Sequence, residues 1–220
     1  MSGSKESLYE RLRGATRPLH DELEGAVRIG ERLESPASYA SHLVQLWQLH
    51  TSAETGLQAL DFRPLGFVYP SPYRAALLEA DLDFLGISAA RLQALPLPPA
   101  PTLPSLAAGL GCIYVVEGSA KGARAILPDI KSALGFDSEG GAAFFSGRGQ
   151  EGKLLWRAFL AAIEHIPPGS EDADQAVDAA QATFAMFRAG LLEPAPEHLT
   201  SVEASKAPRP LTRPLQPIRP

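Results

Sequence analysis

The chain has 220 residues, of which 45% are hydrophobic and 20% are charged, and its formal net charge is −5. This composition is typical of a globular protein with one sizeable core or two small ones, and the negative charge argues against broad binding to nucleic acid. The single cysteine, Cys112, excludes an internal disulfide. The polar start and the lack of a long apolar run favour a cytoplasmic protein without a signal peptide or a membrane span.

The first three segments with helical periodicity each begin with a recognisable start signal. Ser7 and Glu10 predict a capping box, and Ser35-Pro36 and Ser71-Pro72 each place a capping residue before a proline. Pro18 lacks an amide N–H, so we expect it to kink or split the first helix near residues 14–17. A short helix over residues 88–95 follows the third segment.

The second half of the chain also has helical periodicity. Residues 96–101 form a proline-rich connector, which we interpret as a surface crossing within one domain. Helices are expected over about 103–134, 151–165 and from Ser170 onward, and no segment alternates as a strand would. The chain is therefore predicted to be all-α, with one helical domain over residues 6–192 and a proline-rich, disordered tail over 193–220.

His20 is the first candidate for chemistry. A neutral imidazole can bind a metal through one ring nitrogen, and Glu24, one turn later, could accept the other N–H. Arg13 and Arg17 lie on roughly the same side, which would suit a ligand with a metal centre and carboxylates at its rim. Taken alone, this segment favours the alternative of a half-buried histidine in a surface ion-pair cluster.

Gly118 and Gly122 form the second candidate feature. Each glycine inside a helix costs about 1 kcal/mol relative to alanine, so a pair one turn apart calls for a reason. Close helix packing is one reason, and room for a flat ligand beside the backbone is another. Ser119 lies beside this bend and could order water. The pair alone favours helix packing.

Together the two segments are far more specific. Residues 12–24, LRGATRPLHDELE, resemble the proximal-histidine helix of the heme oxygenase family, and residues 114–123, YVVEGSAKGA, resemble its distal helix, particularly in the bacterial branch. The resemblance covers about residues 6–192. It implies an all-α, multi-helix bundle with heme sandwiched between a proximal helix and a kinked distal helix. It also implies oxidative cleavage of heme to biliverdin, carbon monoxide and ferrous iron, with O2 as co-substrate.

The resemblance implies a role for individual residues. His20 matches the iron ligand, Glu24 matches an acidic position near it, and Gly118 and Gly122 match the distal glycines. Basic positions near the heme propionates, which would set the rotation of the ring, are matched by Arg13, Arg17, Lys153 and Arg157.

Ser119 departs from the aspartate that many family members have at that position. A hydroxyl can hold a water molecule but cannot carry the charge of a carboxylate. Ser119 therefore joins Gly118 and Gly122 as the predicted catalytic set, and a non-catalytic heme carrier or sensor stays an alternative. One cysteine cannot hold an iron–sulfur cluster, so electrons would come from an external reductant such as a ferredoxin or a flavoprotein reductase. A bilin-binding photoreceptor could accept the product.

Two other interpretations concern the remaining residues. His50 and Glu54 lie one turn apart, as in a carboxylate-bridged di-iron bundle, but the required spacing does not recur elsewhere. His50 is better explained as a core residue, and His42, His165 and His198 as surface residues. The groove at the glycine pair could also simply pack against a partner.

Overall fold

The computed structural model describes residues 6–70, 73–118 and 120–193, except for the side chains of residues 24, 25, 120 and 121. Over these residues it is helical, with only isolated bridges beside Asp137. The helices are α1 (Leu8–Ala26), α2 (Ile29–Arg32), α3 (Pro36–Gln58), η1 (Arg63–Leu65), α4 (Arg74–Phe84), α5 (Ala89–Gln93), α6 (Leu106–Gly118), α7 (Ala120–Leu134), α8 (Ala143–Ser146), α9 (Gly149–Ile163) and α10 (Glu171–Leu192).

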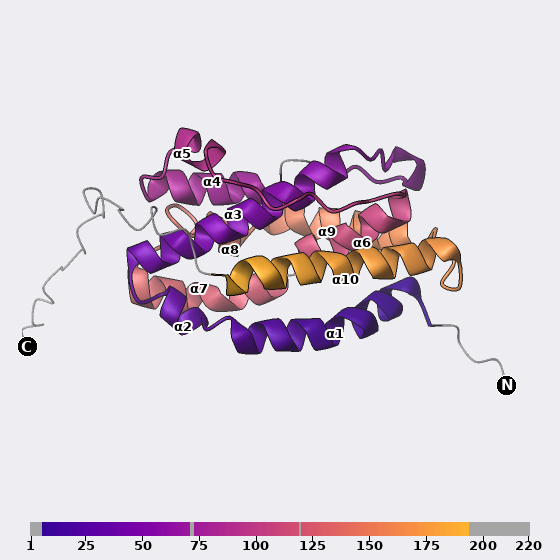
Figure 1. Ribbon diagram of the computed structural model, residues 1–220, viewed down its shortest axis with the longest axis horizontal. Coiled ribbons are helices and arrows are strands. Elements are labelled where there is room, and N and C mark those ends of the chain that lie inside the picture. Colours follow the sequence, from indigo (N-terminus) through magenta and orange to yellow (C-terminus); the bar gives the residue numbers. More distant parts are fainter. Residues whose placement is uncertain (1–5, 71–72, 119, 194–220) are drawn as a thin grey trace, which may run out of the picture.

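Three long helices define the long axis of the molecule. Figure 1 shows α10 lying between α1 and α3, and α10 contacts both of them. The most extensive contact of α10 is with α6, which lies behind it in this view. Gly111 makes that approach possible, because a Cβ at this position would overlap the carbonyl of Ala176 on α10. A Cβ on Gly109 would instead lie 2.5 Å from Leu60 Cδ1, in the segment that follows α3.

The predicted helix starts at Ser7, Ser35 and Ser170 are confirmed. The Ser7 hydroxyl accepts the Glu10 amide at 3.2 Å and the Glu10 carboxylate accepts the Ser7 amide at 2.8 Å, which completes the capping box. Of the expected kink or split at Pro18, the split is wrong, because α1 continues through this residue without interruption. Pro18 and Gly14 are both exposed, so water can satisfy the carbonyl that the proline leaves without a donor.

The proline-rich connector lies against α3. Gln48 donates a hydrogen bond to the carbonyl of Pro96 at 2.6 Å, and Ser52 donates one to the carbonyl of Pro98 at 2.7 Å. These bonds hold the connector on the surface of the bundle while it leads from α5 to the start of α6. None of the described helices is both long and apolar enough to cross a membrane.

The short helices α2 and α8 were not predicted from the sequence. The buried carboxylate of Asp81, on α4, accepts the amides of Ala143 at 2.7 Å and Phe144 at 2.8 Å, and so caps the start of α8. His42 corrects a second expectation, because it is 4% exposed and not a surface residue. His50 is buried as predicted, and His165 is exposed as predicted. The predicted helix start at Ser71-Pro72, the predicted tail and His198 lie outside the described residues.

Candidate functional site

The structure places His20 on an exposed part of α1. Its ring lies edge-on to Phe184 of α10, with 6.2 Å between the ring centroids. Arg13 and Arg17 are also exposed, and Arg17 Nε lies 3.8 Å from the carboxylate of Asp21. The side chain of Glu24, the expected acceptor for the second ring nitrogen, lies outside the described part of the chain.

Tyr114 joins the helix of His20 to the helix of the glycine pair. Its ring meets Tyr9 edge-on at 6.1 Å between centroids, and its hydroxyl lies near the hydroxyl of Thr16. From this contact, His20 lies one turn beyond Thr16 on α1, and Gly118 lies one turn beyond Tyr114 on α6. Both helices start toward the same end of the molecule in Figure 1. His20 and Gly118 therefore lie on the same side of this contact.

Gly118 and Gly122 border open space. Both are exposed, a Cβ on Gly118 would first meet Trp156 at 3.9 Å, and a Cβ on Gly122 would meet nothing within 4 Å. Gly111 differs from both, because α6 can pack against α10 only if this residue has no side chain. The described neighbours therefore do not explain the pair, and the backbone at both positions is accessible. Ser119 and the side chain of Lys121 lie outside the described residues.

The predicted basic residues lie on two helices that contact one another, α1 and α9. Tyr114 links these helices, because its ring also lies 6.4 Å from that of Trp156 on α9. Burial raises the pKa of the Tyr114 hydroxyl, and Thr16 and the nearby charge of Arg13 partly offset that rise. All four cations are exposed: Arg13, Arg17, Lys153 and Arg157.

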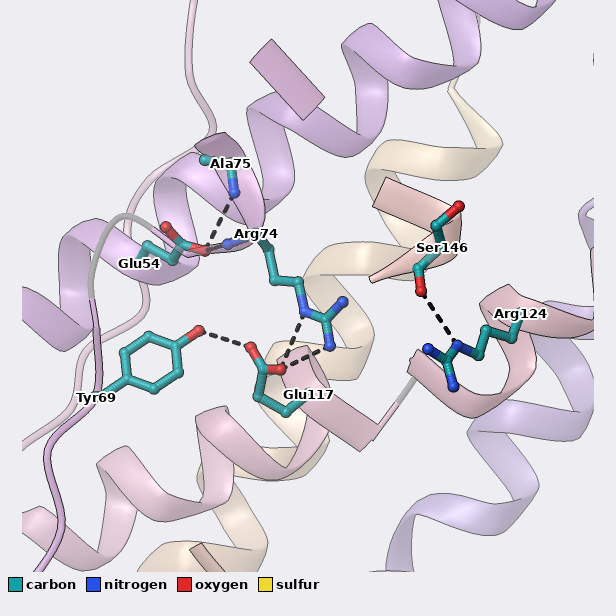
Figure 2. A network of polar contacts seen from close by, with 7 residues as sticks. All are labelled: Glu54, Tyr69, Arg74, Ala75, Glu117, Arg124 and Ser146. Carbon is teal, nitrogen blue, oxygen red and sulfur yellow. Dashed lines mark hydrogen bonds and ion pairs between the residues drawn. The ribbon is translucent and has the colours of Figure 1, made fainter. Parts of the chain in front are cut away.

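A buried ion pair immediately precedes Gly118, and the sequence analysis missed it. Arg74 donates to one carboxylate oxygen of Glu117 through Nε at 3.0 Å and Nη2 at 2.7 Å, and Tyr69 donates to the other oxygen at 3.0 Å (Figure 2). Arg74 is 5% exposed and Glu117 is 6% exposed. The pair joins residues 43 apart in the chain, so no local pattern could have revealed it.

Glu54 anchors the other side of this network. Its carboxylate accepts the amides of Tyr73, Arg74 and Ala75, the last two shown in Figure 2, at 2.8, 2.6 and 3.2 Å. Burial raises the pKa of Glu54, and the three N–H donors oppose that rise. Its oxygens therefore cap α4, which argues against the di-iron arrangement with His50. In the described part of the chain, no cluster of three or more His, Cys, Asp or Glu side chains could hold a metal ion.

Two comparisons with known proteins found a match. The family model for heme oxygenase matches residues 6–193. Among solved structures, heme oxygenase from Neisseria meningitidis, described with NO and CO bound, superposes with a TM-score of 0.64 at 20% identity. The match covers 93% of this chain and 98% of that one, and it shows a shared fold. The comparison with curated proteins finds no match. The match to the family model over most of the chain shows that this protein belongs to the heme oxygenase family.

Proposed function

We propose that this chain binds heme between α1 and the start of α7, and cleaves it to biliverdin, carbon monoxide and ferrous iron. The observation that carries the proposal is the accessible backbone at Gly118 and Gly122, on the same side of the Tyr114 contact as the exposed His20. A flat ring needs bare backbone on one face and a ligand for its metal on the other. The described residues fit that requirement.

His20 would bind the iron through one nitrogen of its neutral imidazole. The carboxylate of Glu24, one turn later on α1, would accept the other N–H and so hold the ring in one tautomer and orientation. Phe184 of α10 lies edge-on to this imidazole.

The cations of α1 and α9 would bind the propionates. Guanidinium and ammonium groups form charge-assisted hydrogen bonds with carboxylates, and arginine can do so with two bonds at once. Because α1 and α9 contact each other, cations from the two helices would reach the same edge of the ring. Because the propionates lie on one edge of heme, these cations would determine which edge faces the distal glycines.

On the distal side, Gly118 and Gly122 would let the ring lie against the helix backbone, and the hydroxyl of Ser119 would hold a water molecule. When bound, heme would supply the iron at which O2 is activated and is itself the ring that is cleaved. Electrons would come from a ferredoxin or a flavoprotein reductase, and a bilin-binding photoreceptor could take the product.

The first experiment tests heme binding and the ligand. Hemin is titrated into the wild type, His20→Ala and His165→Ala, and the absorption spectrum is recorded. His165 is the matched control, because it is an exposed histidine beyond the end of α9. We expect a histidine-ligated spectrum for the wild type and His165→Ala, and a strongly altered one for His20→Ala. An unchanged spectrum in His20→Ala would remove His20 from the site.

Turnover separates an oxygenase from a carrier or sensor. The hemin-loaded wild type is given O2 and either ascorbate or a ferredoxin with its reductase, and the product is identified by absorption. We expect biliverdin. A protein that binds hemin and keeps it intact under these conditions would be a carrier or a sensor.

A further inference from the structure

Polar contacts hold the chain on both sides of the distal glycines. On the first side, Glu117 directly precedes Gly118 and is bound by Arg74 of α4. On the second side, Arg124 lies two residues beyond Gly122 and donates through Nε to the carbonyl of Ser146 at 3.1 Å. Figure 2 shows both contacts in one view, on either side of the junction between α6 and α7.

Both contacts lead back to α4. Arg74 is the first residue of α4, and Asp81 lies in its last turns. The carboxylate of Asp81 caps α8, and α8 ends at Ser146, the residue whose carbonyl accepts from Arg124. A continuous series of contacts therefore runs from the end of α6, along α4 and α8, to the first turns of α7.

The core holds this series in place. Glu54 of α3 binds three amides at the start of α4, and α4 packs along α3. The two junction contacts differ in their surroundings, because the Arg74–Glu117 pair is buried and Arg124 is exposed. The exposed contact can therefore be removed with little risk to the core.

We infer that α4 and α8 form a brace that fixes the position of the end of α6 relative to the start of α7. Arg74, Glu117 and Arg124 are the positioning residues for the backbone at Gly118 and Gly122. This inference rests on the proposed function only in its second part, the effect of the brace on the distal space of bound heme. The mechanical part concerns the chain alone and has its own test.

The choice of a buried ion pair supports a positioning role. Two charges lose their hydration when they are buried, so replacing both with apolar groups is often neutral or stabilising, whereas removing one is strongly destabilising. The pair instead fixes the orientation of the two side chains relative to each other, because two nitrogens of Arg74 converge on one oxygen of Glu117. Apolar side chains at both positions would keep the packing but would not fix this orientation.

The test measures amide hydrogen exchange in the heme-free protein, over the last turn of α6 and the second turn of α7. The variants are Arg124→Met, Arg74→Met, Glu117→Met and the double variant Arg74→Met/Glu117→Met. Arg63→Met is the control, because Arg63 is an exposed arginine whose ion pair with Asp61 lies outside the brace. We expect amide exchange in these two turns to be roughly tenfold faster in Arg124→Met and in the double variant than in the wild type. In the control, exchange should stay at the wild-type rate.

Thermal unfolding of the same variants separates positioning from stability. Each single substitution in the buried pair is expected to lower the unfolding midpoint. The double variant is expected to have a midpoint closer to that of the wild type, although amide exchange in its two turns stays fast. Exchange that returns to the wild-type rate in the double variant, or that is unchanged in Arg124→Met, would overturn the brace.

The hemin-loaded protein provides a second readout, the affinity for imidazole as a probe of the distal space. We expect the double variant to change this affinity about fivefold, while the spectrum without imidazole stays that of the wild type. An unchanged affinity would contradict the positioning role. A wild type that fails to bind hemin would refute the proposed function, and the exchange experiment would still decide on the brace.

Discussion

At the scale of single residues, two buried histidines of α3 give the protein a sensitivity to acid. His42 and His50 are 4% and 1% exposed, and burial lowers the pKa of each to about 3. Both imidazoles are neutral in the native state, whereas in the unfolded chain they take up protons below about pH 6.5. The native state is therefore favoured above that pH and loses stability as the pH falls.

We predict that acid destabilises the wild type more than His50→Leu. Each buried histidine should cost about 2 kcal/mol of unfolding free energy at pH 5 relative to pH 7.5, because the unfolded state alone gains protons. Urea unfolding at the two pH values measures this difference. His165→Leu, at an exposed position, should keep the wild-type difference. An equal loss in His50→Leu and the wild type would contradict the assignment.

The two histidines also show where the sequence pattern fails. His50 lies on the apolar stripe of its helix and was correctly placed in the core. His42 lies off that stripe, but every residue from 39 to 47 is buried, so this part of α3 has no solvent-facing side for a pattern to reveal. Hydrophobic periodicity identifies a helix that has one solvent-exposed face. It cannot show which residues are buried on a helix that is covered on all sides.

At the scale of elements, the glycines of α6 and α7 fall into two kinds. Gly111 is needed because the carbonyl of Ala176 lies where a side chain would be. Gly122 has nothing within 4 Å of that place, so the fold itself does not demand a glycine there. Gly111 lies among apolar residues, whereas Gly122 lies between Lys121 and Arg124, but only the structure shows what each glycine faces.

We predict that alanine separates the two positions. Gly111→Ala should lower the unfolding free energy by at least about 2 kcal/mol, because a rigid backbone must move. Gly122→Ala should be neutral or should stabilise by up to about 1 kcal/mol, yet it should weaken hemin binding, because a methyl group would enter the proposed site. Urea unfolding and hemin titration measure the two effects. Full hemin affinity in Gly122→Ala would argue against a ring at this backbone.

Element boundaries were predictable wherever the signal is local. The caps at Ser7, Ser35 and Ser170 are formed by residues within three positions of the amides that they bind. The start of α8 instead depends on Asp81, which is 62 residues from Ala143. A four-residue helix with a tertiary cap has no signature of its own in the sequence.

At the scale of the whole molecule, the all-α class and the family follow from the sequence, whereas the charge network behind the distal glycines does not. The resemblance indicated His20, Gly118 and Gly122, and these residues stay predictions until heme binding is measured. The contacts of Arg74 with Glu117 depend on how α4 docks against α6, and only a folded structure provides that information.

The extent of the domain gives a prediction at this scale. Among the described residues the buried core extends from Leu8 to Leu191, and the family match ends at residue 193. We therefore expect a chain that ends at Glu193 to keep the thermal midpoint and the hemin affinity of the full-length protein. Calorimetry and hemin titration check this expectation. A lower midpoint in the shortened chain would show that residues 194–220 contribute to the fold.

The packing of α1 against α10 has a consequence for the order of events during synthesis. These helices occupy opposite ends of the chain, and α10 is a principal partner of α1. A ribosome releases the chain from its N-terminus, so α1 leaves the exit tunnel long before its partner exists. Its apolar residues, with Leu8 and Leu12 fully covered in the native state, stay uncovered through most of translation. Of the described helices, the one that carries His20 is therefore made first and buried among the last.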